Sequence, residues 1–253
     1  MDDSALLDLA VALAEQAAAA IMQVRAAGFS VTAKADDSPV TVADTQAEAI
    51  ITAGLRAAAP HIPVVAEEEV AAGRVTALGA QYWLVDPLDG TREFAAGRQE
   101  FAVNIGLIRD GVAVLGAVAS PALHEVHYGA LGMGAFRRRN GESVRIFARR
   151  APPAGLTVMA SRHYAADPAL AALLGTYKIA SLTNIGSALK FLRVAEGAAD
   201  FYPRLGRTME WDTAAPQAVV EAAGGCVLTA ACEKLRYGKK NFENPDFYVW
   251  GLR

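Results

Sequence analysis

Cysteine is scarce in this chain and basic residues are not in excess, and each absence excludes a class of protein. The 253 residues include two cysteines, Cys226 and Cys232, which match no metal-binding spacing and imply no disulfide framework, so a reducing compartment fits. The net charge of −3 argues against a nucleic-acid-binding surface. We therefore expect a small-molecule partner and no nucleic acid.

Signals for export and for membrane insertion are also missing from the sequence. The first residues, Met1-Asp2-Asp3, lack the basic region of a signal peptide, and no apolar run reaches the length that crosses a membrane. We therefore expect a cytoplasmic protein without a transmembrane segment, as a monomer or a homodimer. A peripheral association with the inner membrane stays open.

The chain is long enough to bury a sizeable core. Its composition, 53% apolar and 20% charged, is that of a globular protein with one large domain or two small ones. The composition changes near residues 151–153, and beyond them predicted strands and helices alternate, as in α/β units. We therefore expect an N-terminal half, residues 1–150, and a C-terminal half, residues 151–253.

One stretch, residues 82–91, changes character halfway. It begins as a short apolar run, which predicts a buried strand, and then contains Asp86, Pro87 and Asp89. Because proline has no N–H, the hydrogen-bond ladder of the strand stops there, and the two carboxylates lie at the strand end. Together with the backbone carbonyl of Leu88 they form an all-oxygen set of ligands that suits Mg²⁺.

Glycine and threonine follow the second aspartate. Gly90 lets a backbone approach a ligand closely, and if a helical turn follows, the N–H groups of Gly90, Thr91 and Arg92 form an anion site. A metal site beside an anion site indicates phosphate chemistry. The alternative is an ordinary strand-end turn, because Asp-Pro and Asp-Gly are common turn pairs. Acidic residues elsewhere favour the first interpretation.

Further acidic residues lie where predicted elements meet. A short strand over 62–66 ends in three glutamates, 67–69, whose side chains would alternate along an extended strand. Asp212 opens a helix, and Asp44 precedes a helix over residues 45–59. Both aspartates also fit a capping role. A shared metal cluster explains four such positions better than unrelated caps, and its members are Glu67, Asp86, Asp89 and Asp212.

Other segments predict structure alone. Residues 101–108 and 112–119 predict an antiparallel hairpin. Residues 4–26 predict a helix that is capped by Ser4 and ended by Gly28, and Asp36-Asp37-Ser38-Pro39 predicts a turn. Two further helices are expected over 168–174 and from Ser187 to Glu196, the second capped by Ser187. Strands are expected over 156–160, 177–181, 200–204, 226–229 and 247–250.

Two further patterns receive structural interpretations. His124 and His127 fall in a strand-like segment, where residues three apart point to opposite faces, so we assign them no metal role as a pair. Arg137-Arg138-Arg139 precedes an Asn-Gly hairpin turn. We interpret this run as a solvated strand edge that prevents sheet pairing.

Three motifs resemble those of the inositol monophosphatase superfamily, the lithium-sensitive, Mg²⁺-dependent phosphatases. They are Ala66-Glu67-Glu68, Asp86-Pro87-Leu88-Asp89-Gly90-Thr91, and Trp211-Asp212-Thr213-Ala214-Ala215 followed by Gly224-Gly225. Within the superfamily the chain is similar to the CysQ-type 3′(2′),5′-bisphosphate nucleotidases. The motifs similar to this branch are residues 34–41, 83–94, 186–191 and 194–197, with Tyr202-Pro203-Arg204. The resemblance covers nearly the whole chain.

The resemblance implies a layered αβαβα sandwich with the site between its two halves, the N-terminal half carrying most metal ligands. Matched position by position, the implied Mg²⁺ ligands are Glu67, Asp86, the Leu88 carbonyl, Asp89 and Asp212. The implied phosphate-binding backbone is Gly90 and Thr91, with Asp44 orienting the Thr91 hydroxyl. The positions that would hold the 5′-phosphate of a nucleotide are Ser187, Lys190, Arg204 and, as a weaker match, His163.

The implied activity is hydrolysis of the 3′-phosphate of adenosine 3′,5′-bisphosphate to AMP, as needed in sulfur assimilation and nucleotide recycling. Two or three Mg²⁺ ions would activate a water positioned by Thr91 and Glu67, and Li⁺ would inhibit. Three alternatives stay open: an inositol-1-monophosphatase or related sugar phosphatase, a catalytically inactive metal- or phosphate-binding regulatory protein, and a metal-free protein whose acidic turns are caps. Lys190 and Arg204 favour the nucleotidase, because a substrate with one phosphate does not need a distal cationic pocket.

Overall fold

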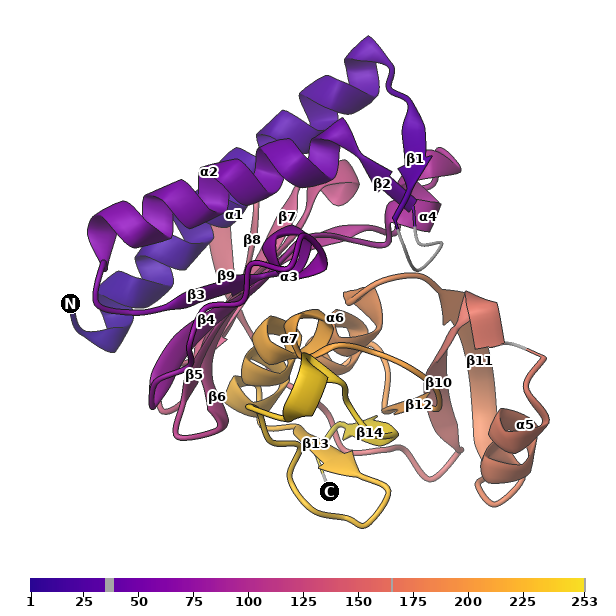
Figure 1. Ribbon diagram of the computed structural model, residues 1–253. Helices are drawn as coiled ribbons and strands as arrows, with labels where there is room; N and C mark the ends of the chain where they lie inside the picture. Colours follow the sequence, from indigo (N-terminus) through magenta and orange to yellow (C-terminus); the bar gives the residue numbers. More distant parts are fainter. Residues whose placement is uncertain (35–38, 165, 253) are drawn as a thin grey trace.

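The fold has five layers, which Figure 1 shows from the side. A computed structural model of the chain describes residues 1–34, 39–164 and 166–252, with the backbone alone at His163. The layers are, in order, helices α1 (Asp3–Ala27) and α2 (Val42–Ala58), a seven-stranded sheet, helices α6 (Leu189–Ala195) and α7 (Glu210–Ala222), a five-stranded sheet, and helix α5 (Pro168–Leu174). The predicted αβαβα sandwich is therefore confirmed.

The seven-stranded sheet is built from the first half of the chain. Its order is β3-β4-β5-β6-β7-β8-β9, with β3 and β4 parallel and every other pair antiparallel. The bounds are β3 Val64–Ala66, β4 Gln81–Asp89, β5 Ala102–Arg109, β6 Val112–Ser120, β7 Glu125–Ala130, β8 Gly134–Arg139 and β9 Glu142–Ile146. Strand β4 is buried from Tyr82 to Leu88, as its apolar run predicts.

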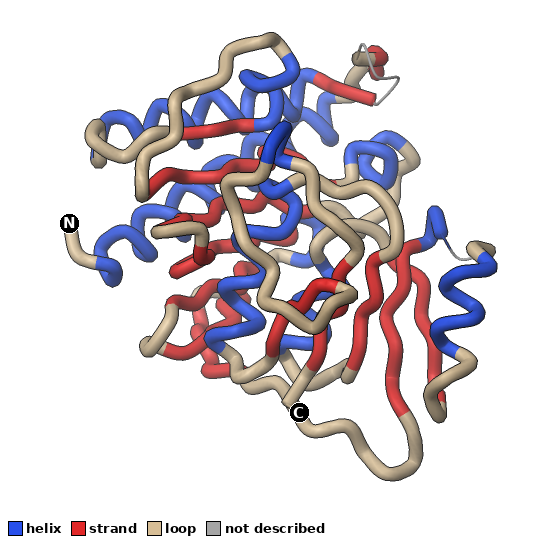
Figure 2. Tube along the Cα trace, turned by 60° about the horizontal axis from the view of Figure 1, so that its bottom comes forward, coloured by secondary structure: helices blue, strands red, loops and turns tan. Residues whose placement is uncertain are grey.

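The five-stranded sheet is mixed, and Figure 2 shows its strands in red beside the other elements of the second half. Its order is β11-β10-β12-β14-β13, with β10 parallel to both of its neighbours. The bounds are β10 Leu156–Ser161, β11 Ile179–Ile185, β12 Phe201–Arg204, β13 Cys226–Thr229 and β14 Phe247–Trp250. The smaller elements are β1 Val31–Ala33, β2 Pro39–Thr41, α3 Glu67–Ala71, α4 Thr91–Ala95, and the 3₁₀ turns Pro121–Leu123, Arg162–Tyr164 and Lys240–Phe242.

Helix α7 lies very close to the seven-stranded sheet, because glycines face it. A Cβ at Gly106 on β5 would lie 2.6 Å from the backbone N of Ala215, and one at Gly116 on β6 would lie 2.4 Å from its O. Real side chains essentially never approach so closely, so these two positions require glycine for the observed packing. The close approach brings the first turn of α7, with Asp212, over the end of β4.

Most predicted elements are present, with shifted ends. The hairpin of β5 and β6 is confirmed, and Asp110 and Gly111 turn it with φ of 51° and 73°. Helix α1 ends before Gly28 as predicted, but its N-cap is Asp2, which accepts a hydrogen bond from Ala5 N, and not Ser4. The strand predicted over 177–181 starts two residues later and continues to Ile185. The predicted turn at Asp36-Asp37-Ser38 lies outside the described residues.

The arginine run does not form a sheet edge. Arg137, Arg138 and Arg139 lie in β8, between β7 and β9, so their backbone groups are already paired on both sides. Their side chains pair with Glu196, Glu15 and Glu125, respectively. The run looked solvated in the sequence because its acidic partners lie at least 14 positions away along the chain.

Helix α1 is long and apolar enough to cross a membrane by length and composition. The sequence predicts no apolar segment long enough to cross a membrane, and α1 contradicts that prediction by its length and composition. The same helix packs against the seven-stranded sheet, and the side chains of its inner face, among them Leu6, Ala10, Ala14 and Ile21, are buried. This packing is that of a core helix.

Candidate active site

Two aspartates lie where β4 stops pairing regularly with β5. Asp86 is opposite Asn104 and Asp89 is opposite Ala102, and the register shifts between them, at Pro87. Asp86 is 1% exposed, and its Oδ1 accepts a hydrogen bond of 3.0 Å from Leu88 N. The irregular strand end thus directs both carboxylates into one cavity, as the proline predicts.

The turn after Asp89 depends on a glycine. Gly90 has φ 94° and ψ 38°, in the left-handed region, and a Cβ there would lie 2.9 Å from the carbonyl oxygen of Glu100. Helix α4 begins at the next residue, Thr91. The Thr91 hydroxyl donates to Asp44 Oδ1 at 3.0 Å and also lies 3.0 Å from the Leu88 carbonyl oxygen.

Asp44 is not the N-cap of α2. The cap is Thr41, and Asp44 is the third residue of the helix, where its Oδ2 accepts hydrogen bonds of 2.7 Å from both Thr41 N and Thr41 Oγ1. Burial raises the pKa of Asp44, and the hydrogen bonds from Thr41 and Thr91 oppose that shift. Asp44 therefore caps a helix with one oxygen and orients Thr91 with the other.

The three glutamates after β3 are helical, which corrects the expectation that they alternate along a strand. They begin α3, where two of them share one basic partner and the third has its own. Lys34 Nζ lies 2.7 Å from Glu67 Oε1 and also contacts Glu68, whereas Glu69 pairs with Arg56. Glu67 therefore comes to the cavity from the first turn of a helix, and Lys34 binds it there.

Asp212 reaches the same cavity from the opposite half of the chain. It is the third residue of α7, and its Oδ2 accepts a hydrogen bond of 2.9 Å from Met209 N. The N-cap is therefore Met209 and not Asp212, but Asp212 binds the cap residue with one oxygen and leaves its other oxygen for the cavity. Asp89 makes a similar connection, since its Oδ2 accepts a hydrogen bond from Ala188 N, just before α6.

The carboxylates of the cavity disfavour one another's ionisation. Burial, followed by the charges of Glu67, Asp89 and Asp212, raises the pKa of Asp86 well above its usual value. Burial raises the pKa of Asp89 to about 6, although Lys190 opposes the shift, and burial with the Asp89 and Glu67 charges raises the pKa of Asp212 to about 8. Such a group of carboxylates is stabilised by a bound cation.

Basic residues also line the cavity, among them the predicted Lys190 and Arg204. Lys190 is 4% exposed, and burial lowers its pKa to about 8, although the charge of Asp89 opposes this. Its ammonium donates to the Ser187 carbonyl and lies 5.2 Å from the centre of the Tyr202 ring. Arg204 lies over the ring of Tyr164 at 4.6 Å and donates to the Arg207 carbonyl.

Ser187 lies one position further out than predicted. The N-cap of α6 is Ala188, and Ser187 Oγ is 3.4 Å from Leu189 N, at the limit of a hydrogen bond. The backbone of Ser187 has φ 51°, an uncommon conformation for serine. A short turn before α6 thus places Ser187 and Lys190 on the wall of the cavity.

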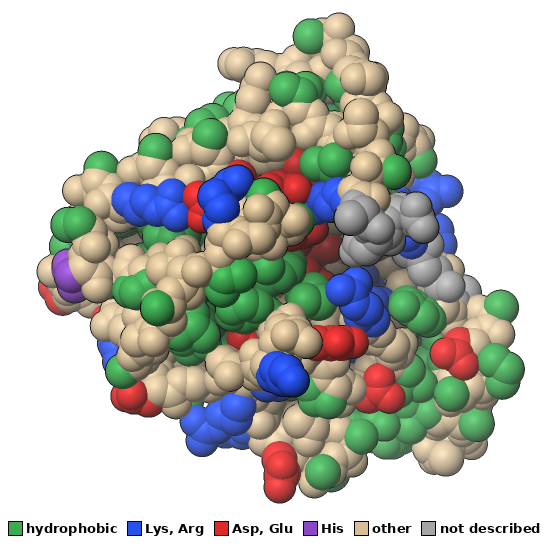
Figure 3. Space-filling view, viewed as in Figure 1, with side chains coloured by type: hydrophobic (Ala, Val, Ile, Leu, Met, Phe, Trp, Pro, Cys, Tyr) green, Lys and Arg blue, Asp and Glu red, His purple; other side chains and the backbone are tan. Residues whose placement is uncertain are grey.

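A single cavity of about 260 Å³ brings the predicted site residues together. On the face drawn in Figure 3, acidic side chains gather in a hollow with Lys and Arg side chains beside them. The predicted residues that line the cavity are Glu67, Asp86, Leu88, Asp89, Gly90, Thr91, Ser187, Lys190, Arg204 and Asp212. Asp44 is one hydrogen bond behind them, through Thr91. The side chain of His163 is outside the described part of the structure.

Some residues around the cavity received no role from the sequence. Lys34 binds Glu67, and Tyr202 lies beneath Lys190. Glu48, in the interior of α2, is 5% exposed and accepts a hydrogen bond of 2.7 Å from Glu68 N, and burial raises its pKa to about 7. A glutamate on the otherwise apolar face of a helix is the one sequence signal that could have identified Glu48.

Comparison with known proteins agrees with this geometry. The sequence model of the Inositol monophosphatase family matches residues 2–248. The 3′(2′),5′-bisphosphate nucleotidase CysQ of Salmonella typhimurium is 43% identical over 247 residues, which cover 96% of this chain and 99% of that protein. The Escherichia coli K12 protein of the same name is 42% identical over the same shares.

Solved structures show the same fold. CysQ from Bacteroides thetaiotaomicron, a bacterial member of the inositol monophosphatase family, superposes with a TM-score of 0.82 at 32% identity, covering 98% of each chain. The inositol monophosphatase of Anabaena (Nostoc) has a TM-score of 0.79 at 26% identity over 98% of this chain and 91% of its own. The chain belongs to the inositol monophosphatase family, and membership implies a bound divalent metal ion.

Proposed function

We propose that this protein is a Mg²⁺-dependent phosphatase that removes the 3′-phosphate of adenosine 3′,5′-bisphosphate, releasing AMP and phosphate. Relatives named 3′(2′),5′-bisphosphate nucleotidase match over almost the whole chain. The single observation that carries the proposal is the cavity itself. Its lining holds the four predicted carboxylates, which form the acidic wall, and the predicted cations Lys190 and Arg204, which form the basic wall, together with Glu93 and Arg92.

The acidic wall fits a magnesium site. Its donors are all oxygens, as Mg²⁺ prefers, and the raised pKa values of Asp86, Asp89 and Asp212 support the proposal, because a bound cation would favour their ionised forms. The proposed ligands are Glu67, Asp86, the Leu88 carbonyl, Asp89 and Asp212. When bound, two or three ions would lower the pKa of a coordinated water and neutralise charge on the phosphate.

The protein's own groups position the reaction. Thr91 donates its proton to Asp44, so the hydroxyl oxygen can accept a hydrogen bond from the attacking water. Glu67, whose side chain is 27% exposed toward the cavity, would accept the water's second proton. The backbone turn at Gly90 and Thr91 would hold the phosphate oxygens. No protein nucleophile is required, because water attacks directly.

The basic wall would bind the second phosphate of the substrate. Lys190 and Arg204 supply charged donors, and the Ser187 hydroxyl lies beside them in the cavity. His163 stays a predicted contact. An inositol monophosphate would leave both cations without a partner, which is why we favour the nucleotide over a singly phosphorylated sugar.

The inactive and metal-free alternatives have less support. A regulatory protein that has lost catalysis should lack a ligand or Thr91, yet the predicted metal ligands and Thr91 are all present and line one cavity, and Asp44 accepts a hydrogen bond from Thr91. A protein whose acidic turns are caps alone would not bring four carboxylates together. We further propose inhibition by Li⁺, a cytoplasmic location, and a monomer or homodimer without a nucleic-acid partner.

Phosphate release tests the proposal. Adenosine 3′,5′-bisphosphate and inositol 1-phosphate are compared side by side with Mg²⁺, with EDTA, and with Mg²⁺ plus Li⁺. Preference for the nucleotide that is lost in EDTA and reduced by Li⁺ is the expected result. Preference for inositol 1-phosphate would keep the metal site and refute the role of the basic wall. No release from either substrate would favour the inactive alternative.

A further inference from the structure

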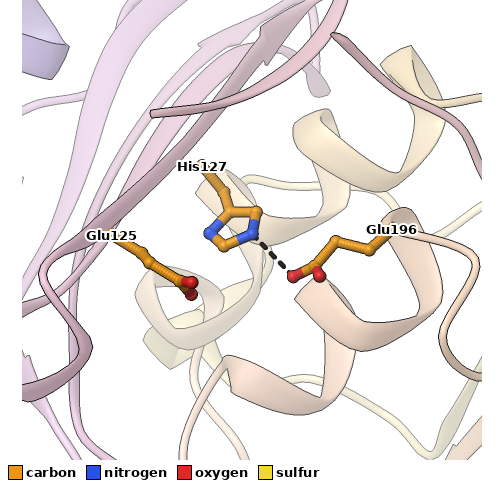
Figure 4. Close-up of side chains that lie close together, drawn as sticks. All are labelled: Glu125, His127 and Glu196. Atoms are coloured by element: carbon orange, nitrogen blue, oxygen red, sulfur yellow. Dashed lines mark hydrogen bonds and ion pairs between the residues drawn. The ribbon is translucent and has the colours of Figure 1, made fainter. Parts of the chain in front are cut away.

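A second group of possible metal ligands lies outside the cavity described above. Glu125 and His127 are in β7, and Glu196 follows the last residue of α6. One nitrogen of His127 and one oxygen of each glutamate lie within 4.8 Å of one another. Figure 4 shows the His127 ring between the two glutamates. His127 is 1% exposed and Glu125 is 6% exposed. His127 and Glu125 therefore depend mainly on protein groups, and not on water, for polar partners.

Glu196 determines which nitrogen of His127 carries the proton. His127 Nε2 lies 2.7 Å from Glu196 Oε1, and Glu196 is also paired with Arg193 at 3.0 Å and Arg137 at 3.3 Å. Burial raises the pKa of Glu196, but the hydrogen bond from His127 and the nearby positive charges bring it below its usual value. An ionised carboxylate can only accept, so Nε2 donates, and in the neutral form that a metal ligand requires Nδ1 carries a lone pair.

That lone pair points toward another acceptor. In Figure 4, Nδ1 lies on the side of the ring nearer the Glu125 carboxylate. Among the described residues, neither His127 Nδ1 nor Glu125 Oε2 has a hydrogen-bond partner, although both atoms are buried. Ser120 Oγ is also buried and unpartnered, and Ser120 is directly opposite Glu125 in the β6–β7 ladder. Buried acceptors without a donor are costly and call for an explanation.

We propose that His127 Nδ1 and Glu125 Oε2 bind a late first-row divalent metal ion such as Zn²⁺, with Ser120 Oγ beside it and Glu196 as the carboxylate that orients the imidazole. A nitrogen–oxygen donor set suits zinc, copper or nickel and not magnesium. A ligating histidine commonly donates its other N–H to a carboxylate, as His127 does to Glu196. The open atoms and the oriented ring are what such a site requires.

A proton shared between the same two atoms is the competing explanation. An imidazolium would donate Nδ1–H to Glu125, yet the structure contains no hydrogen bond at Nδ1. Two ligand atoms of one tetrahedral zinc ion lie roughly 3.3 Å apart, because each metal–ligand bond is about 2.0–2.2 Å long. Such atoms bind the ion and not each other, so a zinc site needs no hydrogen bond between His127 Nδ1 and Glu125. The nearby arginines do not block the ion: Arg137 and Arg193 are bound to Glu196, and Arg139, 3.6 Å from Glu125, is 60% exposed.

The site would join the two halves of the chain. Glu125 and His127 belong to the seven-stranded sheet, and Glu196 is the C-cap of α6. The N-terminal end of the same helix carries Lys190, and the residue before the helix, Ala188, donates its N–H to Asp89. Zinc at His127 would therefore fix the helix that carries Lys190, one of the two cations of the basic wall. The site itself does not depend on the proposed phosphatase activity, so either proposal can fail without the other.

Zinc content measures the site directly. Full-length protein is stripped of metal, equilibrated with buffered free Zn²⁺ and analysed beside the variants His127→Gln and Glu125→Gln. Both variants keep the active-site carboxylates, so any zinc bound there cancels in the comparison. We expect each variant to bind one equivalent less than the wild type. Glu196→Gln should weaken the same equivalent by about 10–100-fold, as loss of an orienting carboxylate does. His61→Ala, which removes an exposed imidazole elsewhere, should change nothing.

Crystals soaked in ZnCl₂ give a second readout that needs no variant. We expect an anomalous diffraction peak at the zinc edge between His127 and Glu125. Equal zinc content in wild type and both variants, or no peak at this position, would overturn the proposal. A doubly protonated His127 ring in nitrogen NMR spectra, with unchanged zinc content, would assign the site to a proton. Glu125→Gln preserves size and shape, so it keeps the test decisive if His127→Gln fails to fold.

Discussion

The two walls of the active-site cavity carry opposite charge, and they differ in how far the protein satisfies that charge. On the acidic wall, Asp86, Asp89 and Asp212 have raised pKa values, because burial and like charges oppose their ionisation. On the basic wall, Lys190 already has the carbonyl of Ser187 and the charge of Asp89 as partners. Burial nevertheless lowers the pKa of Lys190 to about 8, so the difference is that the acidic wall gathers several like charges, which a bound cation would offset, whereas Lys190 has partners within the protein. Metal dependence should be absolute, and phosphate selectivity should be graded.

The largest expected effect follows from removing one carboxylate of the acidic wall. Asp89→Asn should lower kcat by about 10³-fold or more, since metal-mediated charge stabilisation contributes several kcal/mol and each 1.36 kcal/mol is a factor of ten. Phosphate release from adenosine 3′,5′-bisphosphate measures it. Asp110→Asn is the matched control, because Asp110 is exposed in the β5–β6 turn, where asparagine also tolerates positive φ. Near-normal turnover of Asp89→Asn would remove the metal assignment.

The next effect concerns the hydroxyl that contacts Asp44. Thr91→Val keeps the shape of the side chain and removes the acceptor for the attacking water, so kcat should fall by about 10²-fold with little change in KM. Steady-state kinetics separate the two constants. Thr45→Val, at an exposed threonine of α2, should behave as the wild type. An unchanged kcat in Thr91→Val would show that the hydroxyl does not position water.

Removing one of the two cations of the basic wall should reduce, but not abolish, the preference for a substrate with a second phosphate. Lys190→Ala removes a charged hydrogen bond worth about 1.5–3 kcal/mol, so KM for adenosine 3′,5′-bisphosphate should rise by roughly 10–100-fold. KM for adenosine 3′-monophosphate should change little. Because Lys190 is buried, Lys190→Met is a second variant that better preserves packing. Lys178→Ala, at an exposed lysine, is the control. Equal rises for both substrates would place Lys190 outside the phosphate pocket.

The smallest effect is one of stability and depends on pH. The pKa of Asp212 is about 8 and that of Asp89 about 6, both above the unfolded value of 3.8. Because these two carboxyl groups keep their protons to a higher pH in the folded state than in the unfolded state, protonation favours folding. This contribution to stability is fully present below about pH 4, near the unfolded pKa, and is lost as the pH rises through about 8, the folded pKa of Asp212. Mg²⁺ must displace these protons, so its stabilising effect should increase with pH. We expect Mg²⁺ to raise Tm by more at pH 8 than at pH 6. Equal shifts would contradict the raised pKa values.

The local parts of the site could be predicted from the sequence, because their geometry is set by neighbouring residues. The ladder of β4 is interrupted between Asp86 and Asp89, the interval that contains Pro87, although the strand continues to Asp89, and Gly90 permits the left-handed turn into α4; Asp86, Asp89 and Thr91 were thus predicted from one short stretch. Asp44 and Asp212 were found as strand-to-helix junctions, although the cap itself is Thr41 in the first case and Met209 in the second. The resemblance to a known family supplied the distant cations.

Contacts between segments far apart in the chain could not be predicted in this way. Nothing near Lys34 in the sequence indicates that it binds Glu67, 33 positions away. The arginines of β8 looked like a solvated edge because β9 was not foreseen as the outer strand. His127 received a structural interpretation from its spacing to His124, yet the residues that matter to it are Glu125 and Glu196. Such partners are determined by how distant segments pack together, so the sequence pattern of one segment does not indicate them.

The central claim is that one wall of the cavity serves the metal and the other reads a second phosphate. The ratio of kcat/KM for adenosine 3′,5′-bisphosphate to that for adenosine 3′-monophosphate, measured on the wild type with saturating Mg²⁺, tests it most directly. Because one charged contact is worth about 1.5–3 kcal/mol, we predict a ratio of roughly 10–100 or more. A ratio near one, with activity still lost in EDTA, would show that Lys190 and Arg204 do not read the substrate.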